Sequence, residues 1–234
     1  MKKINQEESS SKNTIKPLSA IVLLATLKTK NELSHTAVLV KLLTEKLGRL
    51  NVKSEIIRLI DYDIKPGIKE NMGKGDEWPK ILKKIIAADI IIFATPIWWG
   101  LHSSLMQRVV ERMDSLNDSL LETGTSPLAN KVASLVITGA EDGAQHITGN
   151  LLSFITYNGM TIPPGNSVSW LGDAEGKNEE QLTKLFSKEP TKSMIEVAGD
   201  NIVHMASFLR EQPYPRAIGG IRGSIKSGTV GIKN

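Results

Sequence analysis

The stretch Asp89–Gly100, with the sequence DIIIFATPIWWG, decides the fold. Its first seven residues, Asp89–Thr95, are almost continuously apolar, which is typical of a β-strand that is covered on both faces. Pro96 is expected to stop this strand, because proline has no backbone N–H to donate to a neighbouring strand. A strand of this kind predicts a parallel sheet that lies between two layers of helices.

Outward from this stretch, apolar runs alternate with helical patterns. Strands are predicted at residues 18–26, 52–60, 89–95, 132–138 and 160–170. Helices are predicted at residues 37–47, 78–88, around 105–113, 147–157 and 191–211. Five alternations indicate an α/β fold, a doubly wound sheet of five parallel strands with helices on both faces. Ligands bind past the carboxyl ends of the strands in such sheets, so the loops there are the candidate site.

The chain divides into one domain and two extensions. We expect a flexible N-terminal arm at residues 1–17, a folded domain at 18–211 and a Gly/Pro-rich C-terminal tail at 212–234. Two readings of the C-terminal tail stay open, a disordered tail and a segment that becomes ordered against a second subunit. The long loop 61–77 and the segment 171–190 are candidates for shaping a substrate pocket or a subunit contact.

Composition excludes several classes of protein. Of the 234 residues, 40% are hydrophobic and 23% are charged, a balance that is typical of a soluble globular chain. The absence of cysteine excludes disulfides, thiolate metal sites and iron–sulfur clusters, and it fits a cytoplasmic protein. The apolar run Leu18–Ala25 is too short to span a bilayer, which takes about 20 residues. We therefore expect no membrane partner.

The net charge of +4 at first suggests a nucleic-acid partner. Residues 1–17 carry +2 and residues 212–234 carry +4, whereas residues 18–211 carry −2. The positive excess therefore lies in the two extensions, and no nucleic-acid partner is expected for the folded domain.

The first strand-end loop, residues 26–36 (TLKTKNELSHT), contains no glycine. It is therefore neither a dinucleotide-binding turn nor a Walker A loop. Its hydroxyl and ammonium groups are Thr26, Lys28, Thr29, Lys30, Ser34 and Thr36. The loop leads straight into a predicted helix, whose first N–H groups and positive dipole end favour an anion such as a phosphate monoester. The alternative is that Ser34 or Thr36 only caps the helix.

Two further loops follow the third and fourth strands. The first, Thr95-Pro96-Ile97-Trp98-Trp99-Gly100, exposes a large apolar area unless something flat covers the tryptophans. The alternative is that both rings pack under the next helix or in a subunit contact. The second loop, Thr138-Gly139-Ala140-Glu141-Asp142-Gly143, can direct backbone groups at the edge of a planar heterocycle. A solvated turn is the alternative for this second loop.

Together these three loops resemble those of the NAD(P)H-dependent FMN reductases of the flavodoxin-like superfamily, which also contains the quinone reductases. The resemblance covers residues 18–211 and implies a strand order of 2-1-3-4-5 with FMN at the switch point. The cofactor-binding residues that it implies are Thr26, Lys28, Ser34, Thr36, Pro96, Ile97, Trp98, Trp99, Gly100, Thr138, Gly139, Glu141, Asp142 and Gly143. The first loop departs from the family pattern, because Leu33-Ser34-His35-Thr36 replaces Gly-Asn-Thr.

The resemblance implies an oxidoreductase that passes a hydride from NAD(P)H through FMN to a small acceptor, such as a quinone, a nitro or azo compound or free flavin. It also implies a homodimer or a homotetramer. The flavin carries the chemistry, so no catalytic side chain is needed, although His102 and His146 could bind substrate or donate a proton. The four histidines lack metal-ligand spacing, and no metal is expected. Two alternatives are a flavodoxin-type electron carrier and a binding module without flavin.

Overall fold

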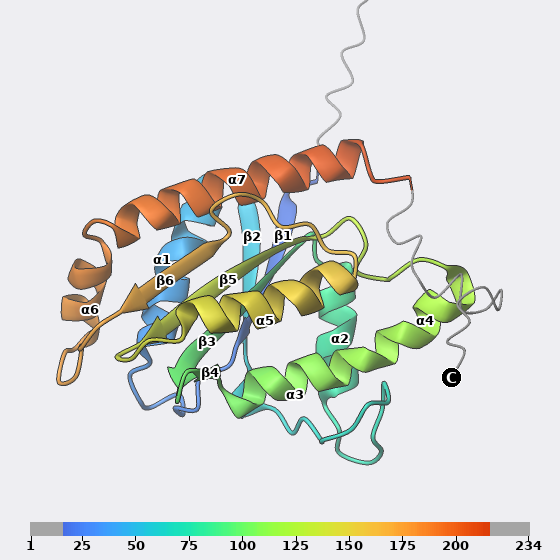
Figure 1. Ribbon diagram of the computed structural model, residues 1–234, viewed down its shortest axis with the longest axis horizontal. Coiled ribbons are helices and arrows are strands. Elements are labelled where there is room, and N and C mark those ends of the chain that lie inside the picture. The colour runs from blue at the N-terminus through green and yellow to red at the C-terminus, as the bar shows by residue number, and fades with distance from the viewer. Residues whose placement is uncertain (1–15, 216–234) are drawn as a thin grey trace, which may run out of the picture.

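The computed structural model describes residues 16–215, which form one sheet with helices on both sides (Figure 1). The strands are β1 (Leu18–Leu24), β2 (Val52–Arg58), β3 (Ile90–Trp98), β4 (Leu101–His102), β5 (Val132–Gly139) and β6 (Ser167–Leu171). Five of them are parallel in the order β2-β1-β3-β5-β6, and the two-residue β4 pairs antiparallel with β3. The predicted flavodoxin-like order 2-1-3-4-5 is confirmed. The short β4 is counted as a strand here, so the fourth and fifth parallel strands are labelled β5 and β6.

Seven α-helices and two single-turn 3₁₀ helices are seen in the described part of the chain. They are α1 (His35–Arg49), η1 (Leu59–Asp61), α2 (Trp78–Ala87), α3 (Ser104–Arg112), η2 (Met113–Ser115), α4 (Leu116–Thr123), α5 (Ala144–Tyr157), α6 (Glu179–Phe186) and α7 (Thr191–Glu211). Helices α1, α6 and α7 cover one face of the sheet, and α2, α3 and α5 cover the other (Figure 1). In β1, Val22 packs on the first face and Leu23 on the second, as the two-residue period of a strand requires.

The prediction that Pro96 ends the third strand is wrong, because β3 continues to Trp98. The Ala94 carbonyl oxygen accepts the N–H of Ala25, which is the first residue after β1. Since hydrogen-bonding direction alternates along a strand, the nitrogen of Pro96 faces the same side, where β1 has already ended. Its missing N–H therefore leaves no partner unsatisfied.

The fifth parallel strand is shorter than predicted, because β6 begins at Ser167 rather than at residue 160. Pro163 and Pro164 precede it and cannot donate to a sheet. Only Thr161 in this stretch forms an isolated bridge, with Val132.

The sequence patterns missed α6, although its start carries a signal. The Asn178 side chain accepts the N–H of Gln181, and the Gln181 side chain accepts the N–H of Asn178. This reciprocal pair is a capping box, which is readable as a polar residue followed three positions later by glutamine.

A buried ion pair fixes the long loop between η1 and α2 onto α3. The Arg112 guanidinium lies 2.8 Å from an Asp76 carboxylate oxygen, and neither side chain is exposed to solvent. Arg112 also donates to the carbonyl oxygens of Lys65 and Glu70. Burial alone would raise the pKa of Asp76, but hydrogen bonds from the Met72 N–H, other backbone groups and Arg112 lower it. The loop is therefore held to the sheet's helical layer through Asp76.

Candidate functional site

A buried serine joins the carboxyl ends of β1 and β3, where the candidate site lies. The Ser103 hydroxyl donates to the Ala25 carbonyl oxygen over 2.7 Å. The Ser103 N–H donates to the Thr95 hydroxyl oxygen over 3.0 Å. The Ser103 hydroxyl oxygen also caps α3 by accepting the Met106 N–H. The loops after these two strands therefore start from fixed positions.

The two tryptophans form the tip of a tight hairpin between β3 and β4. Trp98 pairs with Leu101, so Trp99 and Gly100 are the two turn residues, with φ angles of 51° and 75°. Positive φ at both positions is the pattern of a type I′ turn, which glycine adopts freely and tryptophan does not. Trp98 is 51% exposed and Trp99 is 90% exposed. Neither ring is packed under the next helix of its own chain.

The loop after β5 holds this turn in place. The Trp99 N–H donates to a Glu141 carboxylate oxygen over 2.7 Å. A Cβ atom on Gly143 would lie 2.7 Å from the Gly100 Cα, and the φ of Gly143 is +142°. A Cβ atom on Gly139 would lie 2.8 Å from the Ile97 side chain. The backbone of Gly143 therefore packs against the backbone of Gly100, and Gly139 packs against the Ile97 side chain, at approaches that favour glycine.

The first loop, by contrast, is hydrogen-bonded mostly to itself. A Glu32 carboxylate oxygen accepts the Thr29 N–H over 2.8 Å and the Thr29 hydroxyl over 2.7 Å. These two hydrogen bonds lower the pKa of Glu32, so it stays ionised. The Lys28 ammonium donates to the Leu33 carbonyl oxygen, and Arg58 donates to that of Thr29. The Glu32 carboxylate therefore already accepts the Thr29 N–H and hydroxyl, which the sequence analysis considered as donors to a phosphate.

The remaining predicted hydroxyls of the site are buried and serve the fold. The Ser34 hydroxyl oxygen accepts the Ala37 N–H and caps α1. The Thr36 and Thr138 hydroxyl oxygens lie 2.6 Å apart, which links the start of α1 to the end of β5. The Thr26 hydroxyl oxygen accepts the Lys28 N–H. The capping alternative thus holds for Ser34, while contact of these groups with a cofactor stays a prediction.

The loop after β6 also borders the site, and the sequence analysis did not place it there. A hollow of 460 Å³ lies between the first loop, Ala140 and residues 172–177. Its charged lining residues are Lys28, Glu32, Asp173, Glu175 and Lys177. The sequence feature that could have placed the loop after β6 at this edge is Gly172. It is a turn residue directly after a strand whose carboxyl end lies at the same edge of the sheet.

Two of the three histidines at this edge, His102 and His146, have hydrogen-bond partners within the protein. Burial, and after it the Lys28 ammonium, lowers the pKa of His35, so its imidazole is neutral at pH 7. A His102 ring nitrogen lies 3.3 Å from the Ser103 carbonyl oxygen, and His146 lies 3.0 Å from the Asn150 amide on α5. Among residues 16–215 no group of acidic or histidine side chains could hold a metal ion. Within the same range no helix is both long and apolar enough to cross a membrane.

The residues present fit FMN better at the ring end than at the phosphate end. At the ring end, the exposed indoles of Trp98 and Trp99 directly precede Gly100, on which a Cβ atom would meet nothing within 4 Å. At the phosphate end, the N–H groups of His35 and Thr36 lie at the start of α1, where a helix leaves its first donors without intrahelical acceptors. The Glu32 carboxylate lines the same hollow as His35 and opposes a second negative charge there.

Comparisons with known proteins bear on the family to which the chain belongs. The family described as NADPH-dependent FMN reductase matches residues 20–174. The 8-demethyl-8-aminoriboflavin-5'-phosphate synthase of Streptomyces davaonensis is 31% identical over 213 residues, which cover 84% of this chain and 80% of that protein.

Two solved structures are similar over most of the chain. The crystal structure of RosB with bound 8-demethyl-8-formylriboflavin-5'-phosphate is 29% identical, with a TM-score of 0.80 over 93% of this chain and 90% of that one. The apo NADH:FMN oxidoreductase EMOB is 18% identical, with a TM-score of 0.63 over 89% and 98%, and it supports the fold alone. Since the family match covers residues 20–174 and the 31% identical relative is aligned over 84% of the chain, the chain belongs to the NADPH-dependent FMN reductase family of enzymes.

Proposed function

We propose that this enzyme takes a hydride from NAD(P)H and passes it through FMN to a small acceptor such as a quinone, a nitro or azo compound or free flavin. The observation that carries the proposal is the turn at Trp98 and Trp99. It holds two indoles in solvent at the carboxyl edge of the sheet, in a family named for FMN reduction. Apolar rings held so rigidly and left uncovered favour a flat aromatic ligand.

Separate groups of residues in this chain would bind the ring and the phosphate of FMN. The tryptophan turn, residues 96–100, would cover one part of the ring and keep water from it, and Glu141 would hold that turn in position. The loop 138–143 would offer its backbone groups to the ring edge, and Lys28 with the start of α1 would face the phosphate. When bound, FMN supplies the redox chemistry itself, which explains why no catalytic side chain is needed.

Absorbance and turnover test the proposal together. The purified protein is titrated with FMN, and NADH or NADPH oxidation is then followed with a small quinone. We expect binding at micromolar FMN and steady-state oxidation without a partner protein. An electron carrier would bind FMN but require a separate reductase. A protein that does not bind FMN at micromolar concentration would be a binding module, and the proposal would be wrong.

A second candidate function is that a flavin phosphate is itself the substrate. The observation that favours it is that the 31% identical relative is named as a synthase of a modified riboflavin phosphate, and that RosB holds such a flavin as an intermediate. Mass spectrometry of the flavin after incubation separates the two. FMN of unchanged mass after many NAD(P)H turnovers supports the reductase, whereas a flavin of new mass supports the second candidate.

A further inference from the structure

Two loops border a hollow at the carboxyl edge of the sheet, the loop after β1 and the loop after β6, residues 172–177. In Figure 1 both loops lie at the end of the sheet to which the strand arrows point. The hollow has a volume of 460 Å³, within the range of about 300–1,000 Å³ that is usual for small-molecule sites. Each loop contributes one lysine to its lining, Lys28 from the first and Lys177 from the second. We call it the two-lysine hollow.

The two lysines differ in what they already bind. The Lys28 ammonium donates to the Leu33 carbonyl oxygen of its own loop over 2.8 Å. The Lys177 ammonium forms no hydrogen bond or ion pair with the residues that the structure describes. An ammonium group has three N–H donors. Lys177 can therefore bind a ligand without giving up a contact within the protein.

Three acidic side chains also line the two-lysine hollow, and two of them are held by their own loops. The Glu32 carboxylate accepts the Thr29 N–H and hydroxyl. An Asp173 carboxylate oxygen accepts the Glu175 N–H over 2.9 Å. The third acid, Glu175, is exposed, so water and salt screen its charge. The acids therefore leave the two ammonium groups without an ionic partner.

The pKa of His35 shows the balance of charge at the start of α1, because this residue also lines the two-lysine hollow. Burial lowers this pKa first, and the Lys28 ammonium lowers it next. Lys177 lowers it as well, whereas the Asp173 carboxylate raises it. Two positive charges thus act against one negative charge at this end of the hollow, which favours an anion there.

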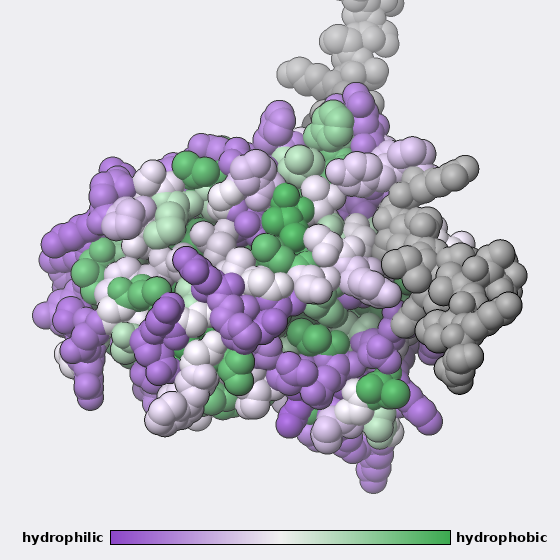
Figure 2. Space-filling model, viewed as in Figure 1, coloured by the Kyte–Doolittle hydropathy of each residue, from purple (hydrophilic) through white to green (hydrophobic). Residues whose placement is uncertain are grey.

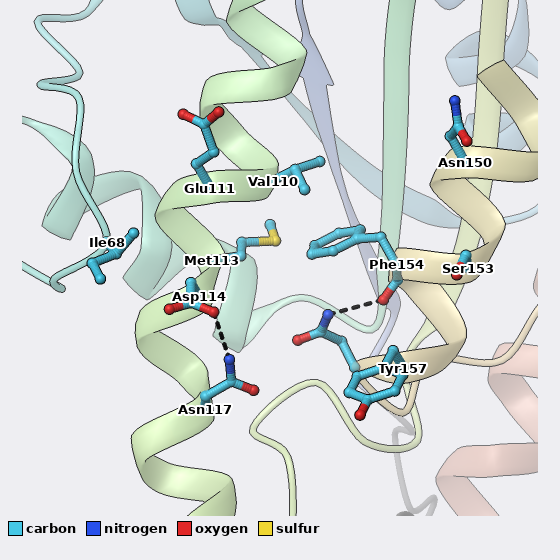
Figure 3. Close-up of a pocket in the computed structure, with 11 residues that line it drawn as sticks. Ile68, Val110, Glu111, Met113, Asp114, Asn117, Asn150, Ser153, Phe154 and Tyr157 are labelled. Carbon is cyan, nitrogen blue, oxygen red and sulfur yellow. Dashed lines mark hydrogen bonds between the residues drawn. The ribbon is translucent and has the colours of Figure 1, made fainter. Parts of the chain in front are cut away.

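A larger hollow, of 640 Å³, lies between α3 and α5, and its chemistry does not suit an anion. Its charged lining residues, Glu111 and Asp114, are both acidic. Figure 3 shows the Asp114 carboxylate accepting the Asn117 amide, with the rings of Phe154 and Tyr157 across from it on α5. In Figure 2 hydrophobic residues lie between the positions of α3 and α5, bordered by hydrophilic residues. Of these two hollows, the two-lysine hollow is therefore the one that suits a phosphate.

We propose that Lys177 binds the phosphate of FMN in the two-lysine hollow, together with Lys28, and so makes the enzyme prefer flavins that carry a phosphate. This assignment rests on the proposed function, because FMN is its ligand. The family match ends at residue 174 and does not include Lys177. The contact joins an ammonium donor to an anionic acceptor, which makes its hydrogen bond stronger than one between neutral groups. Because the hollow is open to solvent, salt weakens the contact.

Flavin affinity of the full-length protein tests the assignment, measured by fluorescence quenching with FMN and with riboflavin, which has no phosphate. K177Q removes the charge and K177R keeps it. K188Q is the matched control, since it removes an exposed lysine just after α6 that does not line the hollow. At low salt we expect K177Q to lower FMN affinity about fivefold and K177R to stay within about twofold. K188Q should have no effect, and riboflavin affinity should be equal in all four proteins.

The pKa of His35 is a second readout, and it needs no turnover. It is followed by NMR of the imidazole ring, and H35Q identifies the signal among the four histidines. FMN should raise this pKa, because a phosphate close to the ring favours its charged form. Riboflavin should leave it unchanged.

Equal FMN affinities for K177Q and K188Q would overturn the assignment, and so would a K177Q effect that is as large for riboflavin as for FMN. A His35 pKa that stays the same with FMN bound would show that the phosphate lies outside the two-lysine hollow. These results would leave the proposed function standing. A natural protein that binds neither flavin would contradict the proposed function and this assignment with it.

Discussion

The loop after β1 and the loop after β3 lie at the same edge of the sheet, but their functional groups differ in whether they already have partners within the protein. In the first, the carboxylate of Glu32 takes up the donors of Thr29, and Lys28 donates to a carbonyl oxygen of its own loop. In the second, Trp98 and Trp99 are left in solvent by a turn that Glu141 holds from another loop. In the first loop the donors of Lys28 and Thr29 therefore have partners within the protein, whereas the rings of Trp98 and Trp99 in the second are uncovered.

This difference says where flavin affinity should come from. Covering on the order of 100 Å² of an indole contributes about 2.5 kcal/mol. A phosphate at the first loop must instead compete with hydrogen bonds that already exist, and it meets the negative charge of Glu32. We therefore expect the ring end to provide most of the binding free energy of FMN, and the phosphate end to provide little.

The largest expected effect comes from Gly143→Ala. The new Cβ atom would lie 2.7 Å from the Gly100 Cα, at a φ of +142° that alanine avoids, so the two ring-end loops must separate. We expect FMN affinity to fall about 100-fold, which is about 2.7 kcal/mol, as measured by flavin fluorescence quenching. Gly149→Ala on α5 is the control, since its Cβ atom meets nothing within 4 Å. Equal affinities for the two variants would show that the loop contact is irrelevant to flavin binding.

Trp99→Ala removes one uncovered ring and is expected to lower FMN affinity about 10- to 30-fold, or about 1.4–2 kcal/mol. Because the ring is 90% exposed, the free energy of unfolding by urea should change little. Tyr157→Ala is a matched loss of an exposed aromatic side chain outside the site and should leave FMN affinity unchanged. A Trp99 variant that loses stability but keeps its FMN affinity would mean that the ring is structural.

Glu141→Ala removes the acceptor that holds the turn, and we expect FMN affinity to fall about fivefold, in line with about 1 kcal/mol for one hydrogen bond. Glu141→Gln keeps an oxygen that can accept the Trp99 N–H. It should therefore stay within about twofold of the natural protein. If the glutamine and alanine variants behave alike, the charge of Glu141 matters and its hydrogen bond to Trp99 does not.

The smallest effect is expected from Glu32→Gln, and its sign is opposite. Removing the negative charge from the first loop should favour a phosphate there and raise the affinity for FMN about threefold at low salt. Riboflavin, which has no phosphate, is the matched ligand, and its affinity should not change. The two ligands are compared by titration at low and high salt. An equal change for FMN and riboflavin would show that the phosphate does not reach this loop.

A feature could be predicted from the sequence when residues close together in the chain determine it, and could not when distant contacts determine it. The apolar runs and the 21-residue helix α7 were predicted because their periods repeat within a few residues. The short helix α4 was missed, because eight residues with one buried side chain give little pattern. The end of β3 was misjudged because the effect of Pro96 depends on where a different strand, β1, stops.

For the candidate site, residue types could be read from the sequence but their roles could not. Thr36 looked like a phosphate ligand, yet its hydroxyl bonds to Thr138, 102 residues away. Glu141 was predicted as a cofactor-binding residue, and its carboxylate is seen to accept the N–H of Trp99, 42 residues away. Arg112 gave no signal at all, although it is fully buried against Asp76.

The sequence by itself determined the layered α/β fold, the edge of the sheet at which a ligand site is expected and the absence of any thiol chemistry. Each of these follows from local patterns or from composition, which need no knowledge of distant contacts. Only the tertiary structure decided that the tryptophans stand in solvent and that the first loop satisfies its own donors. The physical reason is that a polar group takes whichever partner the fold brings within about 3 Å, and that partner is often far away in the chain.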